Sequence, residues 1–288
     1  MVAFLASNKE TDSLTEAMQE YHGLKHAGDF SGAMHVAKKA LDIATTRHGR
    51  EHVNTANVCH DIGGILRSMG DCQNAQRWYE EGLRVRVAQL GRRHPLTASS
   101  LNSLGMLFAE VEDYENAIAA MQAALDIMMQ CKGPDDRDTL TDAVNLASVY
   151  LSAGKVAEGA ELAIGAMQRT ERRCGGVSTE AAMAYEVVAN AYTKQGKYDD
   201  ALAYQEKALA IFERHDGPDS YHGAIALNNI GYSQSMRGDT LAALVSYQLA
   251  KGIFTRTLGM EHPQTQRVVD MINSLLRDAK HAPSMSDA

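Results

Sequence analysis

Apolar residues follow a helical spacing through most of the chain. In the segment that starts at Pro95, Leu101, Leu104 and Leu107 recur at three-residue steps and would form one buried stripe of a helix. After a turn near Asp113, a second segment carries the same kind of pattern, at Ala117, Met121, Ala124, Leu125 and Met128. The pattern therefore predicts a helix, a tight turn and a second helix.

This hairpin recurs with a period of 42 residues. Glycines mark two turn positions in each unit, namely Gly28, Gly70, Gly154, Gly196 and Gly238 in one series and Gly49, Gly91, Gly133, Gly175, Gly217 and Gly259 in the other. Glycine is common where a helix ends, because it adopts left-handed backbone angles without a Cβ penalty. Glu112 is the one departure from the first series. A fixed period of this length is typical of a solenoid, in which each unit buries its apolar face only against its neighbours.

Small residues recur at fixed places within the unit. They include Gly63, Gly105, Ala147, Ala189 and Gly231 in the first helices and Ala33, Ala75, Ala117, Gly159, Ala201 and Ala243 in the second helices. Small side chains let neighbouring helix axes approach closely. We expect these positions to lie in helix–helix contacts.

These residues resemble the tetratricopeptide repeat. The 42-residue period, the segments 90–95 and 258–263, and the run Leu227-Asn228-Asn229-Ile230-Gly231 are similar to repeats of the kinesin light chain type. The resemblance implies an all-α, right-handed superhelical solenoid of six helix-turn-helix repeats with a C-terminal capping helix. We expect that helix to run from Pro263 through Leu276 and to bury Val269, Ile272 and Leu276.

The ends of the chain are expected to differ from the repeats. The prediction is a flexible N-terminus at residues 1–10, one solenoid domain over residues 11–280, and a flexible tail at residues 281–288.

Charge and composition narrow the class of partner. The net charge is −8, which disfavours nucleic acid because phosphate binding needs clustered Lys and Arg. No stretch approaches the length of a membrane span. The four cysteines show no CxxC spacing, as expected for free thiols in a reducing compartment. These features indicate a cytoplasmic protein without a membrane span.

The resemblance places the first helix of each unit on a concave face, where a partner peptide or helix would bind. Recurring asparagines are suited to this role, because an amide both donates and accepts hydrogen bonds. The alternative is that these asparagines are solvated or bond across neighbouring helices. The candidate partner-binding residues are Asn57, His60, Arg67, Asn102, Ser103, Met106, Asn145, Ser148, Asn190, Lys194, Asn228, Asn229, Tyr232 and Met236.

Histidines form one further candidate constellation. His22 and His26 are four residues apart on the first helix, and His60 lies in the next unit, so a metal or pH-sensing site is conceivable. Against it, eleven histidines are scattered along the chain and no carboxylate or cysteine completes a fixed set; no metal is expected. His52, His94 and His262 each precede a helix start, which indicates a loop or capping role.

Motifs of catalysis are absent from the sequence. It has no glycine-rich phosphate loop, nucleophile elbow or zinc-protease motif, so we expect neither an enzyme nor a cofactor. The function indicated is an adaptor or scaffold that binds a protein or peptide partner, with a monomer favoured. The alternatives are a regulator that senses a peptide or ligand by changing the shape of its superhelix, and a structural component that self-associates.

Overall fold

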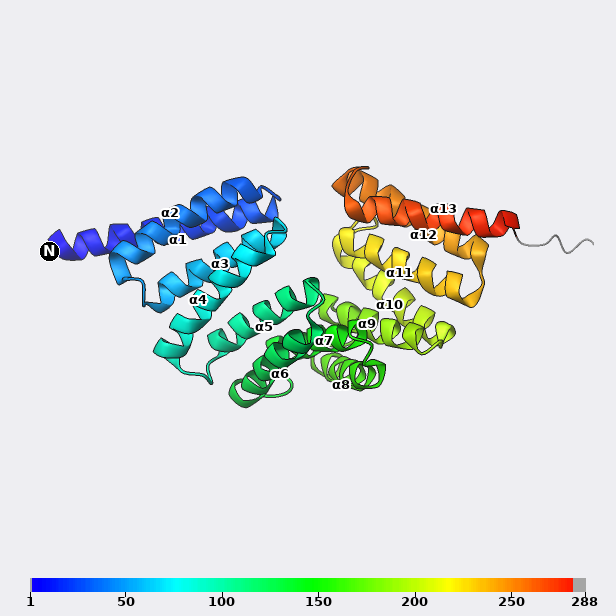
Figure 1. Ribbon diagram of the computed structural model, residues 1–288, viewed down its shortest axis with the longest axis horizontal. Helices are drawn as coiled ribbons and strands as arrows, with labels where there is room; N and C mark the ends of the chain where they lie inside the picture. Colours follow the sequence, from blue (N-terminus) through cyan, green and yellow to red (C-terminus); the bar gives the residue numbers. More distant parts are fainter. Residues whose placement is uncertain (1, 282–288) are drawn as a thin grey trace, which may run out of the picture. The chain divides into compact units, whose positions relative to one another are not determined.

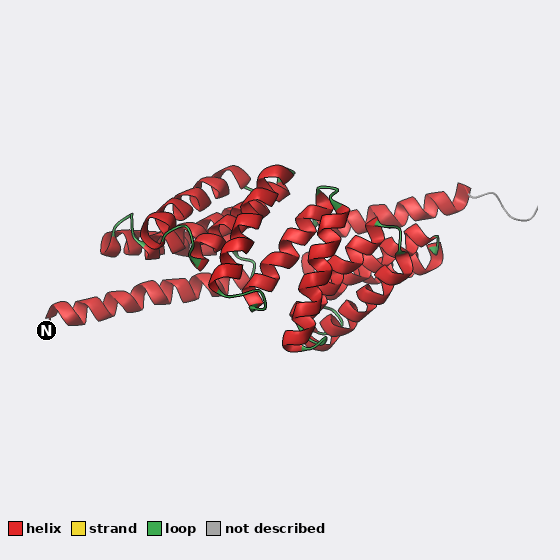
Figure 2. Ribbon diagram, turned by 90° about the horizontal axis from the view of Figure 1, so that it is seen from below, coloured by secondary structure: helices red, strands yellow, loops and turns green. Residues whose placement is uncertain are grey.

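The structure is a computed structural model that describes the backbone of residues 2–281 and the side chains of residues 13–25 and 27–278. Thirteen α-helices and short turns account for this part of the chain (Figures 1 and 2). They are α1 (Val2–His26), α2 (Phe30–His48), α3 (Val53–Ser68), α4 (Cys72–Leu90), α5 (Pro95–Glu110), α6 (Tyr114–Cys131), α7 (Arg137–Ser152), α8 (Val156–Cys174), α9 (Thr179–Lys194), α10 (Tyr198–Asp216), α11 (Tyr221–Arg237), α12 (Thr240–Leu258) and α13 (Pro263–His281). The prediction of an all-α fold of six helix hairpins and a C-terminal helix is confirmed.

The chain divides into two compact units, Met1–Asp142 and Ala143–Ala288. In the first unit, each helix from α1 to α6 packs on the next, and the first helices α3 and α5 also touch. In the second unit, consecutive helices from α8 to α13 pack in the same way, and α9 touches α11. The expectation of one domain over residues 11–280 stays a prediction.

Close packing between helices depends on the small residues of the repeat. A Cβ on Gly63 would lie 2.8 Å from the Tyr79 ring, and a Cβ on Gly231 would lie 2.8 Å from the Tyr247 ring. Ala201 is fully buried, as are its counterparts in four other second helices, Ala33, Ala75, Ala117 and Ala243. The predicted role of these positions in helix–helix contacts is confirmed.

Three histidines cap the helices that follow them. The Nδ1 atoms of His52, His94 and His262 accept hydrogen bonds from the backbone N–H groups of residues 54, 96 and 264, at 3.1, 3.1 and 3.2 Å. Each bond satisfies a donor that the first turn of a helix leaves without a partner. The predicted capping role is confirmed.

The turn between α5 and α6 contains a residue in an unfavourable conformation. Glu112 has a φ of 62° and is the only non-glycine residue with a positive φ in the described part of the chain. Gly70 occupies the equivalent turn of the preceding repeat with a φ of 79°. A side chain in this region crowds its own backbone, whereas glycine does not.

Replacing Glu112 with glycine is therefore expected to stabilise the protein by about 0.4–1 kcal/mol. Urea denaturation followed by tryptophan fluorescence would show the gain as a higher midpoint. A matched control is Glu115→Gly, which introduces glycine three residues later, inside helix α6, and is expected to destabilise. A lower midpoint for Glu112→Gly would contradict the prediction.

The two ends of the chain differ in part from expectation. Helix α1 begins at Val2, so residues 2–10 are helical in the structure; their expected flexibility remains a prediction. Residues 282–288 of the expected tail lie outside the described residues. In α13 the predicted burial of Ile272 is confirmed, but that of Val269 and Leu276 was wrong: Val269 is half-buried, Leu276 is 43% exposed, and Val268 is buried instead.

The first turn of α13 explains this change of register. Thr265 is fully buried, and its hydroxyl donates to the Gly259 carbonyl at 2.8 Å. With Thr265 fixed against the preceding turn, residues three and seven positions later face α12, because these spacings lie on one side of a helix. Those residues are Val268 and Ile272.

Candidate functional site

One position of the first helices carries a buried polar atom in four of the repeats. His60 on α3, Asn102 on α5, Glu186 on α9 and Asn228 on α11 are separated by multiples of 42 residues. The side chain of each has one buried atom that finds no hydrogen-bond partner among the described residues: His60 Nδ1, Asn102 Oδ1, Glu186 Oε1 and Asn228 Oδ1. We call these four residues the polar row. Since a buried polar atom without a partner is costly, its recurrence marks the row as a candidate recognition surface.

Members of the polar row also contact the next first helix. His60 Nε2 lies 3.4 Å from Ser103 Oγ on α5, and Asn229 Nδ2 on α11 donates to Glu186 Oε2 at 2.5 Å. In both pairs the two residues are 43 positions apart, so the same kind of polar contact between successive first helices recurs in the two units. We call these two contacts, His60–Ser103 and Glu186–Asn229, the seam. Asn229 is thus hydrogen-bonded to Glu186 on the neighbouring first helix. This is the role that the alternative to partner binding predicts for these asparagines.

Burial shifts the proton affinity of two members of the row in different ways. Desolvation, aided by the nearby charges of Arg86, Lys25 and Arg67, lowers the pKa of His60 to about 3. Desolvation raises the pKa of Glu186 to about 7, partly opposed by the hydrogen bond from Asn229. His60 is therefore neutral at pH 7, and Glu186 lies near its midpoint.

Two cavities occupy equivalent places between first helices of the first unit. One, of about 490 Å³, lies between α1 and α3 and is lined by Leu14, Thr15, Met18, Arg47, His48, Asn54, Asn57, Val58 and Asp61. The other, of about 360 Å³, lies between α5 and residues 137–142, the part of α7 that belongs to the first unit, and is lined by Pro95, Leu96, Ser99, Asn102, Met128, Lys132, Asp138, Thr141 and Asp142. Met18 and Asn102 are equivalent positions two repeats apart. The cavities therefore follow from the repeat, and the second includes a member of the polar row.

Arg86 occupies the corresponding place between α3 and α5. Its guanidinium donates to Asn57 Oδ1 at 2.9 Å, to the Leu96 carbonyl at 3.0 Å and to Ser100 Oγ at 2.7 Å. Arg86 and its three partners each lie 42 residues before a residue that lines the cavity between α5 and α7. Met128 is the residue equivalent to Arg86. Arg86 is buried, and burial lowers its pKa.

The other candidate residues lie in varied surroundings. Tyr232 and Met236 are 45% and 49% exposed on α11, Ser148 and Lys194 are exposed, and Met106, Asn145 and Asn190 are half-buried. Arg67 forms an ion pair with Glu110 across α3 and α5 at 3.3 Å. Asn57 is held by Arg86 as described above. The structure thus joins His60 to Ser103 within the first unit and brings Glu186 and Asn229 together in the second; whether the predicted residues bind a partner stays a prediction.

The histidine constellation gains no support as a metal site. The side chain of His26 lies outside the described residues. Among the side chains that the structure describes, no group of three histidine, cysteine, aspartate or glutamate residues could hold a metal ion.

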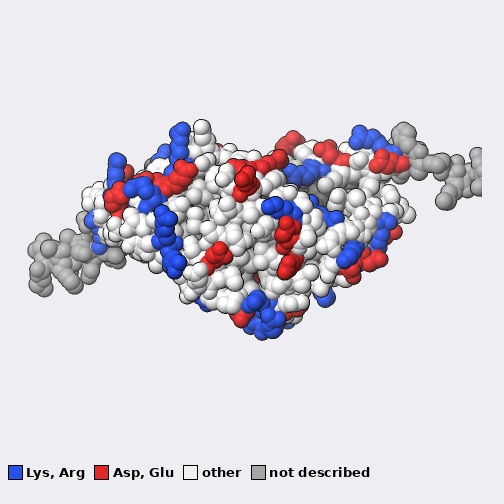
Figure 3. Space-filling model, turned by 60° about the horizontal axis from the view of Figure 1, so that its bottom comes forward, with Lys and Arg blue, Asp and Glu red and all other residues white. Residues whose placement is uncertain are grey.

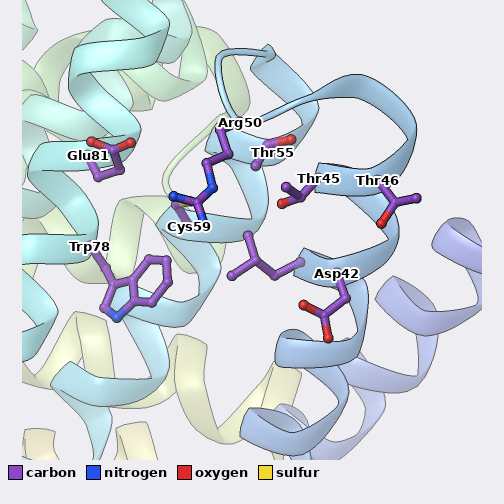
Figure 4. A pocket seen from close by; sticks show the side chains of 9 residues that line it. Asp42, Thr45, Thr46, Arg50, Thr55, Cys59, Trp78 and Glu81 are labelled. Carbon is purple, nitrogen blue, oxygen red and sulfur yellow. The ribbon is translucent and has the colours of Figure 1, made fainter.

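A further cavity, which sequence reasoning did not predict, lies on the second helices of the first unit (Figure 4). Its volume is about 390 Å³, and it is lined by Leu41, Asp42, Thr45, Thr46, Arg50, Thr55, Cys59, Trp78 and Glu81. Figure 4 shows Arg50 extending between the residues of α2 and the α4 residues Trp78 and Glu81. Glu81 accepts two hydrogen bonds from Arg84, at 2.9 Å each, and these bonds are the main cause of its lowered pKa. The carboxylate is therefore already paired within the protein.

Surface charge shows no extended area of one sign on the face seen in Figure 3, where Lys and Arg are interspersed with Asp and Glu. Within the described residues, no helix is both long enough and apolar enough to cross a membrane.

The geometry defines a helical-repeat protein in which each unit is a hairpin packed on the next. The family model of the tetratricopeptide repeat matches the chain at residues 22–86, 60–130, 96–162, 138–214 and 179–256. The chain belongs to the tetratricopeptide repeat family, and its fold is similar to that of kinesin light chain-like repeats. This is a fold of protein-interaction scaffolds.

Solved structures agree with this fold at low sequence identity. BtubC (BKLC) from P. vanneervenii is 20% identical with a TM-score of 0.60, over 88% of this chain and 94% of that one. The nearly identical repeats of a putative kinesin light chain from Podosopora anserina are 17% identical with a TM-score of 0.58, over 72% of this chain and 99% of that one. The apo form of RapI is 12% identical with a TM-score of 0.62, over 94% of this chain and 99% of that one.

Curated relatives match over a shorter stretch. Clustered mitochondria protein homologs from Culex quinquefasciatus and Debaryomyces hansenii are 24% and 26% identical over 163 and 145 residues. These matches cover 57% and 50% of this chain but only 12% and 11% of those proteins. The chain therefore spans a small part of the length of these relatives.

Proposed function

We propose that the protein is a non-catalytic scaffold that binds an extended segment of a partner protein across its first helices. The observation that carries this proposal is the polar row, in which a buried polar atom without a partner recurs at one repeat position. A partner segment lying across α3 and α5, or across α9 and α11, would place its backbone beside the buried or half-buried side chains that carry these atoms.

The spacing of the row suits an extended chain. Neighbouring packed helices have axes about 8–10 Å apart, and an extended chain rises about 3.3 Å per residue, so about three partner residues would span each step. The side chains of Asn102 and Asn228 are half-buried, so rotation about their side-chain bonds would turn the carbonyl oxygens outward. These oxygens would then accept hydrogen bonds from partner N–H groups, because an amide oxygen serves any backbone regardless of its side chains.

Apolar contacts would add anchors in the second unit. Tyr232 lies four residues after Asn228 on α11, about one helical turn away, and Met236 lies four residues further. Both are exposed, and both aromatic and methionine side chains are favoured at interface centres. The partner of this unit would accordingly carry an apolar side chain next to the segment that meets the row.

Affinity capture from a cell lysate with quantitative mass spectrometry tests this proposal. The test variant combines Asn102→Ala with Asn228→Ala and keeps Asn229, which is bonded to Glu186. The control variant combines Gln168→Ala with Asn273→Ala, which removes two exposed amides outside the row.

We expect at least a tenfold loss of captured partner for the test variant, the equivalent of about 1.4 kcal/mol, and full capture by the control. Circular dichroism would verify that both variants are folded. Partners retained equally by all three proteins would overturn the proposal.

A further inference from the structure

A stripe of large apolar side chains is exposed on α12. Leu241, Val245 and Leu249 are 82%, 61% and 54% exposed. They recur every four residues, so they lie together on one face of the helix. Exposed apolar residues that occur singly are normal, but a contiguous set marks an interaction site. We call these three residues the α12 stripe.

The other repeats show that the fold does not require the stripe. The equivalent positions are exposed or half-buried in all five other second helices, where they hold polar or small residues. These are Ser31, His35 and Lys39 in α2; Gln73, Arg77 and Glu81 in α4; Glu115, Ala119 and Ala123 in α6; Ala157, Glu161 and Gly165 in α8; and Asp199, Ala203 and Lys207 in α10. The large apolar residues of α12 therefore need an explanation outside the packing of the repeat.

We propose that the α12 stripe binds the α12 stripe of a second copy of this chain, with the two helices antiparallel about a two-fold axis at Val245. A two-fold interface must be self-complementary, because the same surface serves both partners. Leu241 and Leu249 lie four residues before and after Val245, so Leu241 of each copy meets Leu249 of the other. Gly238 and Gly252 lie seven residues before and after Val245. Because glycine has no side chain, these positions leave room for the two α12 helices to approach closely.

Charges along the helix favour the antiparallel arrangement. The start of α12 is acidic, since Asp199 and Asp239 share one cation, Arg237. The later part carries a net positive charge, since α12 itself holds two cations, Lys251 and Arg256, and one carboxylate, Asp219, pairs with Arg256. Antiparallel helices bring the acidic start of each copy to the basic end of the other, and also oppose the helix dipoles. Parallel helices would bring like charges together.

The size of the stripe sets the expected strength. A single helix pair buries less than the roughly 1,200 Å² of total surface that stable interfaces reach. The dimer is therefore reversible, with a dissociation constant on the order of 10–100 μM. Its contacts lie on a second helix, so the polar row on the first helices remains open, and a dimer would present two partner-binding surfaces.

Sedimentation velocity across a range of protein concentrations tests the dimer. For the wild type we expect the mean mass to rise from 31.3 kDa toward twice that value as the concentration passes the dissociation constant. The matched variant combines Leu241→Asp, Val245→Ala and Leu249→Lys, which gives α12 the residues that α10 carries at the same positions. Because these positions face solvent, the variant is expected to melt at the wild-type temperature but to stay at the monomer mass.

A charge exchange at the axis tests the two-fold arrangement itself. In this arrangement Val245 faces Val245 of the other copy, so Val245→Asp alone and Val245→Lys alone would each place like charges in contact. Each variant is expected to be monomeric, and an equimolar mixture is expected to dimerise.

Three results would overturn the proposal. They are a wild type that remains monomeric up to several hundred micromolar, a matched variant that still dimerises, and a mixture of the two Val245 variants that remains monomeric.

Discussion

Replacing Arg86 with alanine is expected to lower the free energy of unfolding by about 3–5 kcal/mol. The guanidinium donates three hydrogen bonds that join α4 to residues of α3 and α5. Alanine would leave the carbonyl of Leu96, the amide of Asn57 and the hydroxyl of Ser100 without this donor. It would also open a third cavity, equivalent to the two already present between first helices of this unit.

The measurement is urea denaturation followed by the fluorescence of Trp78, which is the only tryptophan of the chain and lies on α4 in the same unit. Arg86→Met is a matched variant, because Met128 occupies the equivalent position of the next repeat. Both variants remove the buried charge, but methionine also fills most of the volume that alanine leaves empty, so we expect less than half of the alanine effect. Equal losses for both variants would show that packing volume does not decide the result.

Replacing Glu186 with glutamine is expected to stabilise the protein by about 2–3 kcal/mol at pH 8 and to have little effect at pH 4. Burial raises the pKa of this carboxyl from 4.5 to about 7, so the folded state binds the proton more tightly than the unfolded state. The contribution of Glu186 to stability is therefore fully present below pH 4.5 and decreases as the pH rises to about 7. Glutamine keeps an oxygen that can accept from Asn229 and carries no charge at any pH.

Hydrogen exchange of peptides from α9 and α11, measured at pH 5 and pH 8 with correction for the intrinsic rate, would report this change where it occurs. Glu206→Gln is the control, because Glu206 is exposed on α10 and its replacement should leave the pH dependence unchanged. A wild type and a Glu186→Gln variant whose stabilities change in parallel with pH would contradict the prediction.

Much of the fold could be predicted because the same pattern of apolar, small and glycine residues recurs in successive repeats. The 42-residue period located the hairpins, and the glycine series drew attention to Glu112, whose positive φ of 62° the structure bears out. His52 and His94 were identified as loop or capping residues from their place before helix starts. In α13 the prediction overlooked a repeated position: Thr265 is equivalent to Thr55 and Thr97, and the three hydroxyls donate to the carbonyls of Gly259, Gly49 and Gly91.

The candidate site could be predicted only in part. Sequence position placed His60, Asn102 and Asn228 on first helices, but it could not show which of their atoms lack partners, since that depends on the side chains of neighbouring helices. Arg86 was missed because an arginine on a helix is usually solvated. A comparison of aligned repeats offers one signal, as the equivalent residues are Ala44, Met128, Thr170, Phe212 and Phe254.

The seam of the first helices has a consequence for how such a protein can evolve. Its polar contacts join residues 43 positions apart, His60 to Ser103 and Glu186 to Asn229, and so link each repeat only to its successor. A gene duplication that adds one 42-residue segment would copy both halves of the seam and one polar group of the row. The chain can thus lengthen by whole repeats the first-helix surface that we propose binds a partner, and selection can then adjust each new side chain without disturbing the older ones.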